Sequence, residues 1–497
     1  MEHVLVSSQN PRIADYLCLL GMPQKSSIPG PWGFPLFGYL PFLNVRAPHK
    51  KLLTLSQKYG PIFQIRLGFL NTVVLTDIKL IREALKRDDF IGRAPLYITH
   101  GIMGGYGLIG AEGPLWRDQR RKTIEWLKRL GMNKVASRDI LEEKIRTGVN
   151  EFLSKIRIMS AENPEINPMP VLHHSLGNVI NNLVFGVTYD ENDSTWKYLQ
   201  TLQEEGVKLI GISGVVNFLP FLRFLPQNRK TIEFLLDGKR RTHAIYDNII
   251  KNCWEMLKEK DLDSYQPKSI LEYFLLEREA RIAENDPLAE NYSDEQLRHL
   301  LADLFGAGVD TTITTLRWFL LYMAKNPSFQ SLLREKLGAF KISELSLADL
   351  ESCDFLRACI AETQRIRSVV PLGIPHGTIK DTTLAGYKIK KNTMIIPLQW
   401  AVHMDPKIWP NPEEFNPFRF LNDDEKFCAP QEFIPFQTGK RICLGEEMAK
   451  ILLNLFCGLV IHNLEINIVP SEDPDMEGVC GITLTPPDGY LIFKEIK

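Results

Sequence analysis

The residues best suited to chemistry lie in one short segment near the C-terminus, Phe436-x-x-Gly439-x-Arg441-x-Cys443-x-Gly445. Gly439 allows a tight turn, and Gly445 allows a flat ligand to approach the backbone. We expect a helix to begin directly after Cys443, so that free backbone N–H groups and the helix dipole lower the pKa of its thiol. A thiolate held in this way is a suitable axial ligand for haem iron. With average residue usage, these five positions arise by chance roughly once in ten thousand such chains. A buried structural cysteine beside a glycine turn is therefore the weaker alternative.

The other cysteines show no comparable pattern. None forms a Cys-x-x-Cys pair, which argues against a zinc ribbon or a thioredoxin-like site. Scattered cysteines in a long chain are usually reduced core residues. We expect that role for Cys18, Cys253, Cys353, Cys359, Cys428, Cys457 and Cys480.

A second candidate region is the middle of an unusually long helical pattern. Ser293-x-x-Gln296 predicts a capping box at its start, and the pattern continues to Lys325, where Pro327 ends it. The stretch 306–315 is rich in glycine and threonine, which form helices poorly. Two explanations stay open. Either small residues allow close helix packing, or threonine hydroxyls bond back to the preceding turn and open the helix locally.

Composition places the chain among ordinary globular proteins. It has 497 residues, 24% charged and 44% hydrophobic, with a formal net charge of −1. These values exclude disordered, collagen-like and disulfide-scaffold classes. They also argue against a nucleic-acid partner that covers the whole surface.

The elements that must position these residues are mainly helical. We predict helices over 47–59 and from Asp77 onward, and nearly continuous helix over 115–370. Short strands are predicted over 62–67, 72–76 and 370–400, irregular chain over 401–440, and a last helix over 444–458. Residues 1–27 contain no recognisable membrane anchor or signal peptide. We therefore expect one large domain over 28–497, mainly α with a small β subregion and a long central helix.

The chain resembles the cytochrome P-450 superfamily of haem-thiolate monooxygenases. Besides the Cys443 segment, three segments match that family in its order: Ala307-Gly308-x-Asp310-Thr311-Thr312, Glu362-x-x-Arg365, and Pro417-Phe418-Arg419-Phe420. The resemblance extends from about residue 28 to the end. It implies the fold of that family, haem b as cofactor with Cys443 as its axial iron ligand, and insertion of one atom of O2 into a C–H bond.

The resemblance also implies roles for the matched residues. Thr311 would hold O2 and a water, and Asp310 would pass protons to them as the catalytic pair. Glu362, Arg365 and Arg419 would form a buried, architectural ion-pair set. The chain departs from the family at 367–368, where it has Arg-Ser and the family commonly has His-Pro.

Haem carries two propionates, so its pocket needs cations. Arginine binds carboxylates well because its planar fork donates two parallel hydrogen bonds. By resemblance, the haem-binding residues besides Cys443 are Arg93, Trp116, Arg120, His376 and Arg441.

The resemblance implies that electrons come from NADPH through a flavoprotein reductase, so that the chain needs no dinucleotide-binding motif of its own. The Gly-rich stretch 101–107 has no strand before it, and we interpret it as a mobile loop over the pocket. A basic face would dock the reductase. An ordinary solvated helix face is the alternative. The face comprises Arg117, Arg121, Lys122, Lys128 and Lys440.

The substrate is predicted to be lipophilic because the expected pocket walls are apolar. Candidate substrate contacts are Leu304, Ala307, Ile374 and Ile482. The apolar stretch 218–226 either contacts a membrane peripherally or packs in the core. The chain is most similar to the microsomal branch that metabolises drugs and steroids, which implies the cytosolic face of the endoplasmic reticulum membrane. Stretches 205–211 and 301–308 resemble arthropod members that hydroxylate ecdysteroid precursors.

Two other functions remain open at this point. Some haem-thiolate proteins rearrange peroxides without O2 or a reductase, although these often lack the Asp310–Thr311 pair found here. A haem-based sensor or lipid carrier would perform no turnover, and would need neither that pair nor a docking face.

Overall fold

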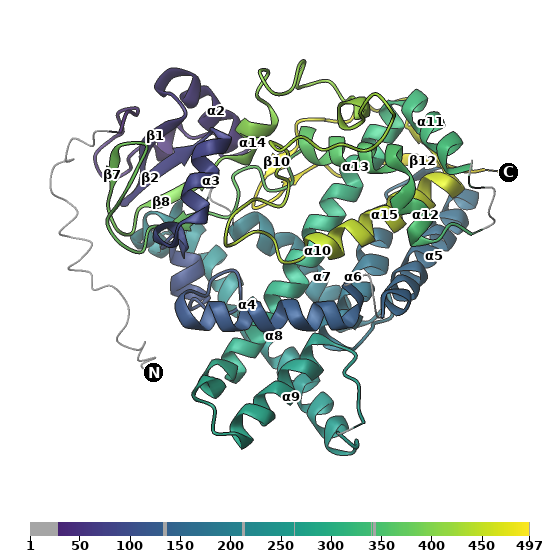
Figure 1. Ribbon diagram of the computed structural model, residues 1–497, viewed down its shortest axis with the longest axis horizontal. Coiled ribbons are helices and arrows are strands. Elements are labelled where there is room, and N and C mark those ends of the chain that lie inside the picture. The colour runs from purple at the N-terminus through teal and green to yellow at the C-terminus, as the bar shows by residue number, and fades with distance from the viewer. Residues whose placement is uncertain are drawn as a thin grey trace.

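The computed structural model describes residues 28–132, 137–210, 214–262, 264–338, 340 and 344–496. The N-terminal stretch 1–27, for which we predicted no anchor, lies outside the described residues. The helices are α2 (Pro48–Tyr59), α3 (Ile78–Lys86), α4 (Gly113–Leu127), α5 (Arg138–Glu162), α6 (Met169–Phe185), α7 (Ser194–Ile210), α8 (Pro226–Lys258), α9 (Ile270–Ala283), α10 (Asp294–Lys325), α11 (Pro327–Gly338), α12 (Leu347–Ser352), α13 (Asp354–Ile366), α14 (Gln399–His403) and α15 (Glu446–Asn463). Helices dominate the described chain, as predicted (Figure 1).

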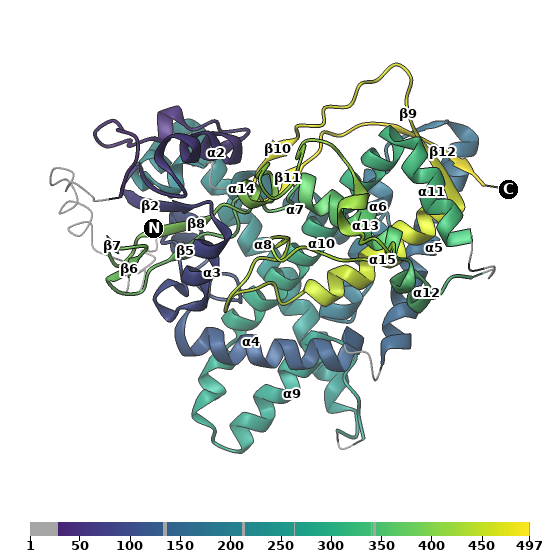
Figure 2. The ribbon, with the colours of Figure 1, turned by 45° about the horizontal axis from the view of Figure 1, so that its top comes forward.

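The strands are short and lie mostly at one end of the molecule. They are β1 (Ile62–Leu67), β2 (Leu70–Leu75), β3 (Gly92–Arg93), β4 (Glu165–Ile166), β5 (His376–Gly377), β6 (Thr382–Leu384), β7 (Tyr387–Ile389), β8 (Met394–Pro397), β9 (Leu464–Ile468), β10 (Val479–Cys480), β11 (Leu484–Thr485) and β12 (Leu491–Glu495). The largest sheet has the order β1-β2-β8-β5-β3. It lies on the left in Figures 1 and 2.

This sheet brings together two residues that are far apart in the sequence. β3 and β5 pair antiparallel, with Arg93 opposite His376. β5 then pairs with β8, which runs parallel to β2. The two predicted haem-binding residues therefore lie opposite each other at one edge of the sheet, Arg93 on the edge strand β3 and His376 on its neighbour β5.

The long helix α10 crosses the middle of the molecule in both ribbon views. It packs against α6, α13 and α15. The apolar side chains of these helices belong to one hydrophobic core. This core is consistent with one domain over 28–497, and the domain boundary itself stays a prediction.

Two details of α10 bear on the two explanations that we left open for the stretch 306–315. The helix is continuous over 294–325, so the local opening that we considered at 306–315 is not present. The hydroxyls of Thr311, Thr312 and Thr315 do bond back to the carbonyls of the preceding turn, at 2.7, 2.8 and 2.8 Å. These bonds leave the ladder intact because each hydroxyl shares a carbonyl with the helix.

At the start of α10, one of the two hydrogen bonds of the predicted capping box forms. The Ser293 hydroxyl accepts a hydrogen bond from the Gln296 N–H at 3.2 Å. The Gln296 side chain does not return to Ser293 and instead bonds the backbone of Gly107. A tertiary contact has replaced the local one.

No helix among the described residues is both long and apolar enough to cross a bilayer.

Candidate active site

The Cys443 segment forms a tight loop before α15. The Cys443 N–H donates to the Phe436 carbonyl at 3.0 Å, and the Ile442 N–H donates to the Gly439 carbonyl at 3.2 Å. Gly439 has φ +81°, and a Cβ there would lie 2.3 Å from the Leu85 carbonyl oxygen. Only glycine fits this turn against the end of α3.

The Cys443 thiol faces opposing influences. Protein packed around it raises its pKa, whereas the Gly445 N–H and the Arg120 charge lower it. Burial has the largest effect and the Glu446 charge adds to it, so the pKa is raised and our expectation of a lowered pKa was wrong. Although protein packed around the sulfur raises this pKa, the Cys443 residue as a whole keeps an exposed surface. A Cβ on Gly445 would meet only the Cys443 Sγ atom, at 3.9 Å, so a flat ligand has access to the backbone here.

Arg441 extends from this loop into a cage of carbonyl groups. Its Nε donates to the Ile91 carbonyl at 2.7 Å, and its Nη2 donates to the Ala111 carbonyl at 2.6 Å. Its guanidinium carbon lies 4.3 Å from the centre of the Trp116 ring. Burial lowers the pKa of Arg441 to about 10, so the side chain remains a cation at neutral pH.

Three further predicted residues lie in the same neighbourhood. Arg120 donates to the Ile442 carbonyl. Arg93 donates to the Ile109 carbonyl at 2.9 Å. Burial and the Arg441 charge lower the pKa of Arg93. The His376 Nδ1–H donates to the Phe90 carbonyl at 2.8 Å, and burial lowers the pKa of the ring.

None of these cations forms a close ion pair within the described chain, although Glu112 acts at longer range on Arg93 and Arg441, and Asp303 acts on Arg93. Among the described residues, no guanidinium nitrogen of Arg93, Arg120 or Arg441 lies within 4 Å of a carboxylate oxygen. Buried cations are stable only when they are paired. This cluster therefore fits an anionic ligand, and the two carboxylates of haem beside the Cys443 thiol satisfy that need.

The side chains of the predicted catalytic pair, Thr311 and Asp310, have different hydrogen-bond partners. The Thr311 hydroxyl donates to the Ala307 carbonyl. The Asp310 Oδ2 atom accepts a hydrogen bond at 2.9 Å from Thr483, in the turn between β10 and β11. Burial raises the pKa of Asp310 to about 6, against the opposing effects of Thr483 and Arg317. Sequence reasoning missed Thr483, which is next to the predicted substrate contact Ile482.

The other predicted substrate contacts lie nearby. Leu304, Ala307 and Thr311 follow the i, i+3, i+7 spacing of one helix face, and Ala307 is exposed. The Ile374 carbonyl accepts a hydrogen bond from Arg93 at 3.4 Å.

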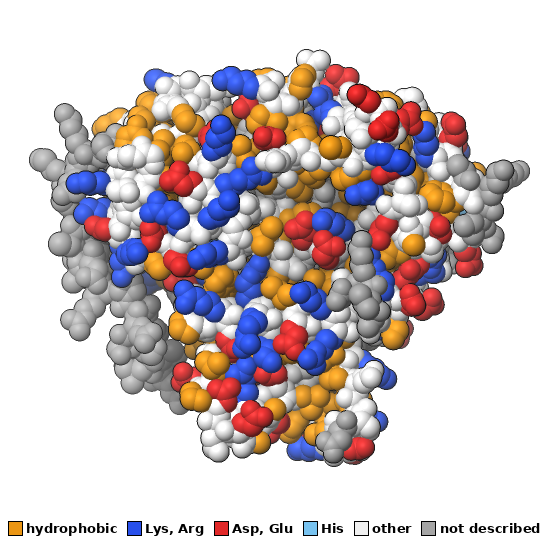
Figure 3. Space-filling view, in the orientation of Figure 1, with side chains coloured by type: hydrophobic (Ala, Val, Ile, Leu, Met, Phe, Trp, Pro, Cys, Tyr) orange, Lys and Arg blue, Asp and Glu red, His pale blue; other side chains and the backbone are white. Residues whose placement is uncertain are grey.

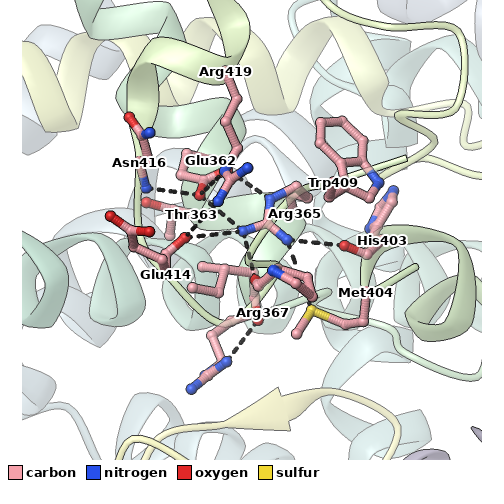
Figure 4. A network of polar contacts seen from close by, with 12 residues as sticks. Glu362, Thr363, Arg365, Arg367, His403, Met404, Trp409, Glu414, Asn416 and Arg419 are labelled. Atoms are coloured by element: carbon pink, nitrogen blue, oxygen red, sulfur yellow. Dashed lines mark hydrogen bonds and ion pairs between the residues drawn. The ribbon is translucent and has the colours of Figure 1, made fainter. Parts of the chain in front are cut away.

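The predicted ion-pair set is present and buried. Arg365 donates to both carboxylate oxygens of Glu362, at 2.7 and 2.8 Å. Arg419 lies 3.4 Å from Glu362. Figure 4 shows Arg365 enclosed by Glu362, Trp409 and the His403 carbonyl, to which it donates at 2.9 Å.

His403, which sequence reasoning missed, connects this set to the Cys443 loop. Its Nε2 accepts the Ile434 N–H at 3.0 Å, and its Nδ1–H donates to the Ser368 hydroxyl at 2.8 Å. The only sequence signal was the departure at position 368, because the usual proline would supply no hydroxyl here.

Comparisons with known proteins agree with this site. The sequence model of the family "Cytochrome P450" matches residues 28–493. The chain is 48% identical to "Cytochrome P450 306a1" of Drosophila melanogaster, an alignment that covers 97% of this chain and 91% of the relative. It is 32% identical to "Cytochrome P450 18a1" of the same organism, over 94% of this chain and 86% of the relative. It is 33% identical to "Cytochrome P450 1A1" of Rattus norvegicus, over 92% and 88%.

The chain belongs to the cytochrome P450 family. It is a haem-thiolate monooxygenase, with haem b and O2 as cofactor and co-substrate. A small-molecule substrate and a redox partner belong to this activity.

The basic face of this P450 lies over α4. Lys and Arg side chains gather there in Figure 3. Arg117 and Arg121 expose 63% and 65% of their side chains, while Lys122 is largely buried against Glu277. Lys440 pairs with Asp88 at 2.7 Å. The face is therefore partly neutralised, and Arg117 and Arg121 remain its most accessible cations.

The apolar stretch 218–226 is partly buried in the core and partly exposed, so neither of its two predicted roles describes all of it. Phe218 and Leu219 are buried in the core. Phe224 exposes 71% of its surface, and its neighbour Leu225 is exposed too. The Phe221 ring lies 6.1 Å from that of Phe69.

Proposed function

We propose that this P450 hydroxylates a lipophilic steroid of the ecdysteroid-precursor class, with electrons from an NADPH-dependent flavoprotein reductase. The apolar candidate contacts Leu304, Ala307, Ile374 and Ile482 support a lipophilic substrate. The likeness of stretches 205–211 and 301–308 to arthropod ecdysteroid hydroxylases supports the steroid class, and the relative at 48% identity comes from an arthropod.

The observation that carries the site assignment is the meeting of Cys443 with the unpaired arginines. Cys443 would ligate the iron, while Arg93, Arg120 and Arg441, with Trp116 and His376, would bind the carboxylates. Metal binding requires the thiolate and releases the thiol proton. Burial raises the pKa of Cys443, and Arg120 favours the thiolate because its charge partly opposes that rise. When bound, the haem supplies the oxygen-activating chemistry, in which one atom of O2 enters the substrate and the other leaves as water.

Thr311 and Asp310 would deliver protons to the reaction. The Thr311 hydrogen is donated to Ala307, so its oxygen lone pairs are left to accept a hydrogen bond from a water at the reacting site. Asp310 has a pKa of about 6, so its carboxyl takes up and releases a proton near neutral pH. Thr483 would hold that carboxyl in place.

We also propose a location and a docking face. The exposed side chains Phe224 and Leu225 would contact the cytosolic side of the endoplasmic reticulum membrane. Arg117, Arg121 and Lys440 would meet the acidic surface of the reductase.

The first experiment is the carbon monoxide difference spectrum of the dithionite-reduced protein. A strongly red-shifted Soret band in the wild type, absent in Cys443→Ala, supports the thiolate assignment. Cys428→Ala is the matched control because that cysteine lies outside the loop and is also exposed, so our expectation of a core role for it was wrong. A red-shifted band that persists in Cys443→Ala would exclude Cys443 as the ligand.

The substrate proposal is tested by iron spin-state titration with sterols, ecdysteroid precursors, fatty acids and terpenoids. Ecdysteroid precursors should bind most tightly and be hydroxylated when the reductase and NADPH are added. Tighter binding and faster turnover of another class would overturn the steroid assignment and leave the monooxygenase assignment intact.

A further inference from the structure

A short segment of backbone, residues 107–111, holds the two most buried arginines of the site. The Ile109 carbonyl accepts a hydrogen bond from Arg93 at 2.9 Å. The carbonyls of Leu108 and Ala111 accept from Arg441 at 3.4 and 2.6 Å. The position of this segment therefore sets where both guanidinium groups lie.

The segment has no regular secondary structure, and α10 holds it in place. The Asp303 Oδ2 atom accepts hydrogen bonds from the N–H groups of Leu108 and Ile109, at 2.7 and 2.8 Å. Gln296 bonds Gly107 twice, accepting its N–H at 3.0 Å and donating to its carbonyl at 3.1 Å. Four bonds from two α10 side chains thus hold three consecutive residues.

Close packing shows that this contact is specific. Gly107 has φ +80°, and a Cβ there would lie 2.2 Å from the Asp303 Oδ2 atom. Burial raises the pKa of the Asp303 carboxyl to about 6, which means that burying its charged form costs free energy. The two backbone N–H groups and the Arg93 charge oppose that shift. Arg93, the cation that acts on Asp303, is thus one that the segment itself holds.

We propose that Asp303 is a positioning residue for haem binding, which fixes segment 107–111 against α10 and thereby aims Arg93 and Arg441 at the haem carboxylates. This inference rests on the proposed role of the two arginines. It assigns to Asp303 an effect on cofactor retention without contact with the cofactor.

The test compares Asp303→Ala with Asp303→Asn in the haem-loaded protein. Alanine removes both bonds to the segment, whereas the asparagine carbonyl oxygen still accepts both N–H groups at one atom, as Oδ2 does. Thr314→Ala is the matched control because it also truncates a buried polar side chain of α10, far along the helix from this segment. If Asp303→Ala does not fold, Asp303→Ser replaces it, since its hydroxyl is too short to reach both amides.

Two readouts are measured on each variant. The first is hydrogen–deuterium exchange of a peptide covering residues 105–112, and the second is the rate of haem transfer to excess apomyoglobin. We expect Asp303→Ala to increase both about tenfold or more, and Asp303→Asn and Thr314→Ala to stay near the wild type.

Each outcome decides the inference. Unchanged exchange in Asp303→Ala, or faster exchange with unchanged haem transfer, would overturn it. So would an equal loss in Asp303→Asn, because the effect would then not follow from the two bonds. Arg441→Leu separates this failure from that of the proposed arginine role. If Arg441→Leu also leaves haem transfer unchanged, the arginine assignment has failed.

Discussion

At the scale of single residues, two neighbours on α10 serve different needs. Thr311 donates its hydrogen to the helix and presents lone pairs, while Asp310 is turned toward Thr483 and is partly buried. Adjacent residues on a helix point about 100° apart, so the pair faces two different neighbourhoods at once. This arrangement suits a relay between the reacting site and the β10–β11 turn.

The Thr311 role leads to a prediction about coupling. Thr311→Ala should retain haem but divert reducing equivalents to hydrogen peroxide, so that product formed per NADPH consumed falls several-fold. Thr312→Ala is the matched control, since Thr312 makes the same bond to the preceding turn, at 2.8 Å, but is buried. NADPH consumption, product and peroxide are measured together. Unchanged coupling in Thr311→Ala would refute the role.

The buried Asp310 leads to a prediction about pH. Its pKa is about 6 in the folded protein, against an ordinary value of 3.8, so the folded state binds this proton more tightly than the unfolded chain does. The free energy of unfolding therefore falls as pH rises from about 3.8 to about 6, by about 3 kcal/mol, and changes little above that window. The free energy of unfolding of Asp310→Asn should not show this fall, because asparagine does not titrate.

Thermal unfolding midpoints of the haem-loaded proteins at pH 4.5 and pH 7.5 check this expectation. The advantage of Asp310→Asn should be small at the lower pH and largest at the higher pH, while its turnover is reduced. A midpoint difference that is the same at both pH values would contradict the buried, titrating carboxyl.

At the scale of elements, the sequence predicted those with local signals. Asp77 caps α3 as expected, because its carboxylate accepts the N–H groups of Lys79 and Leu80. β1 and β2 also lie close to the strands predicted over 62–67 and 72–76. The contacts of Gln296, Asp303, His403 and Thr483 could not be predicted, since each joins segments far apart in the chain and leaves no periodic trace.

The site shows the same difference between local features, which the sequence predicted, and features that depend on distant parts of the chain, which it did not. Motif spacing predicted the tight turn before Cys443 and the Glu362–Arg365 pair, because both depend on short-range geometry. The pKa of Cys443 was predicted with the wrong sign, because the helix N-terminus is local whereas the packing around the thiol depends on the whole fold.

The ion pair on α13 leads to a prediction about cofactor incorporation. Glu362→Gln leaves Arg365 buried without a counter-charge, which should cost about 3–5 kcal/mol. Because His403 connects Arg365 to the Cys443 loop, haem content per protein should fall sharply as well. The Soret absorbance relative to protein, together with the unfolding midpoint, measures both effects.

A matched control lies on the same helix. Arg357 pairs with Asp354 at the same i, i+3 spacing, but its side chain is 40% exposed. Arg357→Gln should cost less than about 1 kcal/mol and leave haem content unchanged. Equal effects of the two substitutions would show that burial of the Glu362 set is not what matters.

At the scale of the whole molecule, two segments beside the β1–β2 hairpin carry exposed aromatic side chains. Gly38, in the segment of Trp32, bridges Leu67, and the Phe221 ring, in the segment of Phe224, lies 6.1 Å from the Phe69 ring. Trp32 exposes 70% of its surface and Phe224 exposes 71%, so both side chains are largely open to solvent. A double variant, Trp32→Ser with Phe224→Ser, should bind phosphatidylcholine vesicles several-fold more weakly in a flotation assay, because less apolar area enters the interface. Ile158→Ser, at a residue 61% exposed on α5, is the control. Equal binding by all variants would remove the membrane role of this surface.

The basic face over α4 leads to the last prediction, which concerns association with the reductase. Arg117→Glu with Arg121→Glu should raise the KM for reductase several-fold at low ionic strength, because two exposed positive charges become negative. The defect should fade at about 1 M salt, where the Debye length falls to about 3 Å. Haem content and reduction by dithionite should stay unchanged, since neither depends on a docked protein.

The control reverses the same charges elsewhere. Arg240→Glu with Arg241→Glu alters two exposed arginines on α8, which pair with Asp237 much as Arg121 pairs with Asp118. Net charge changes equally in both double variants. A KM defect confined to the α4 variant therefore reports the location of the charge, and an equal defect in both would mean that the reductase responds only to overall charge, so that no docking face exists at α4.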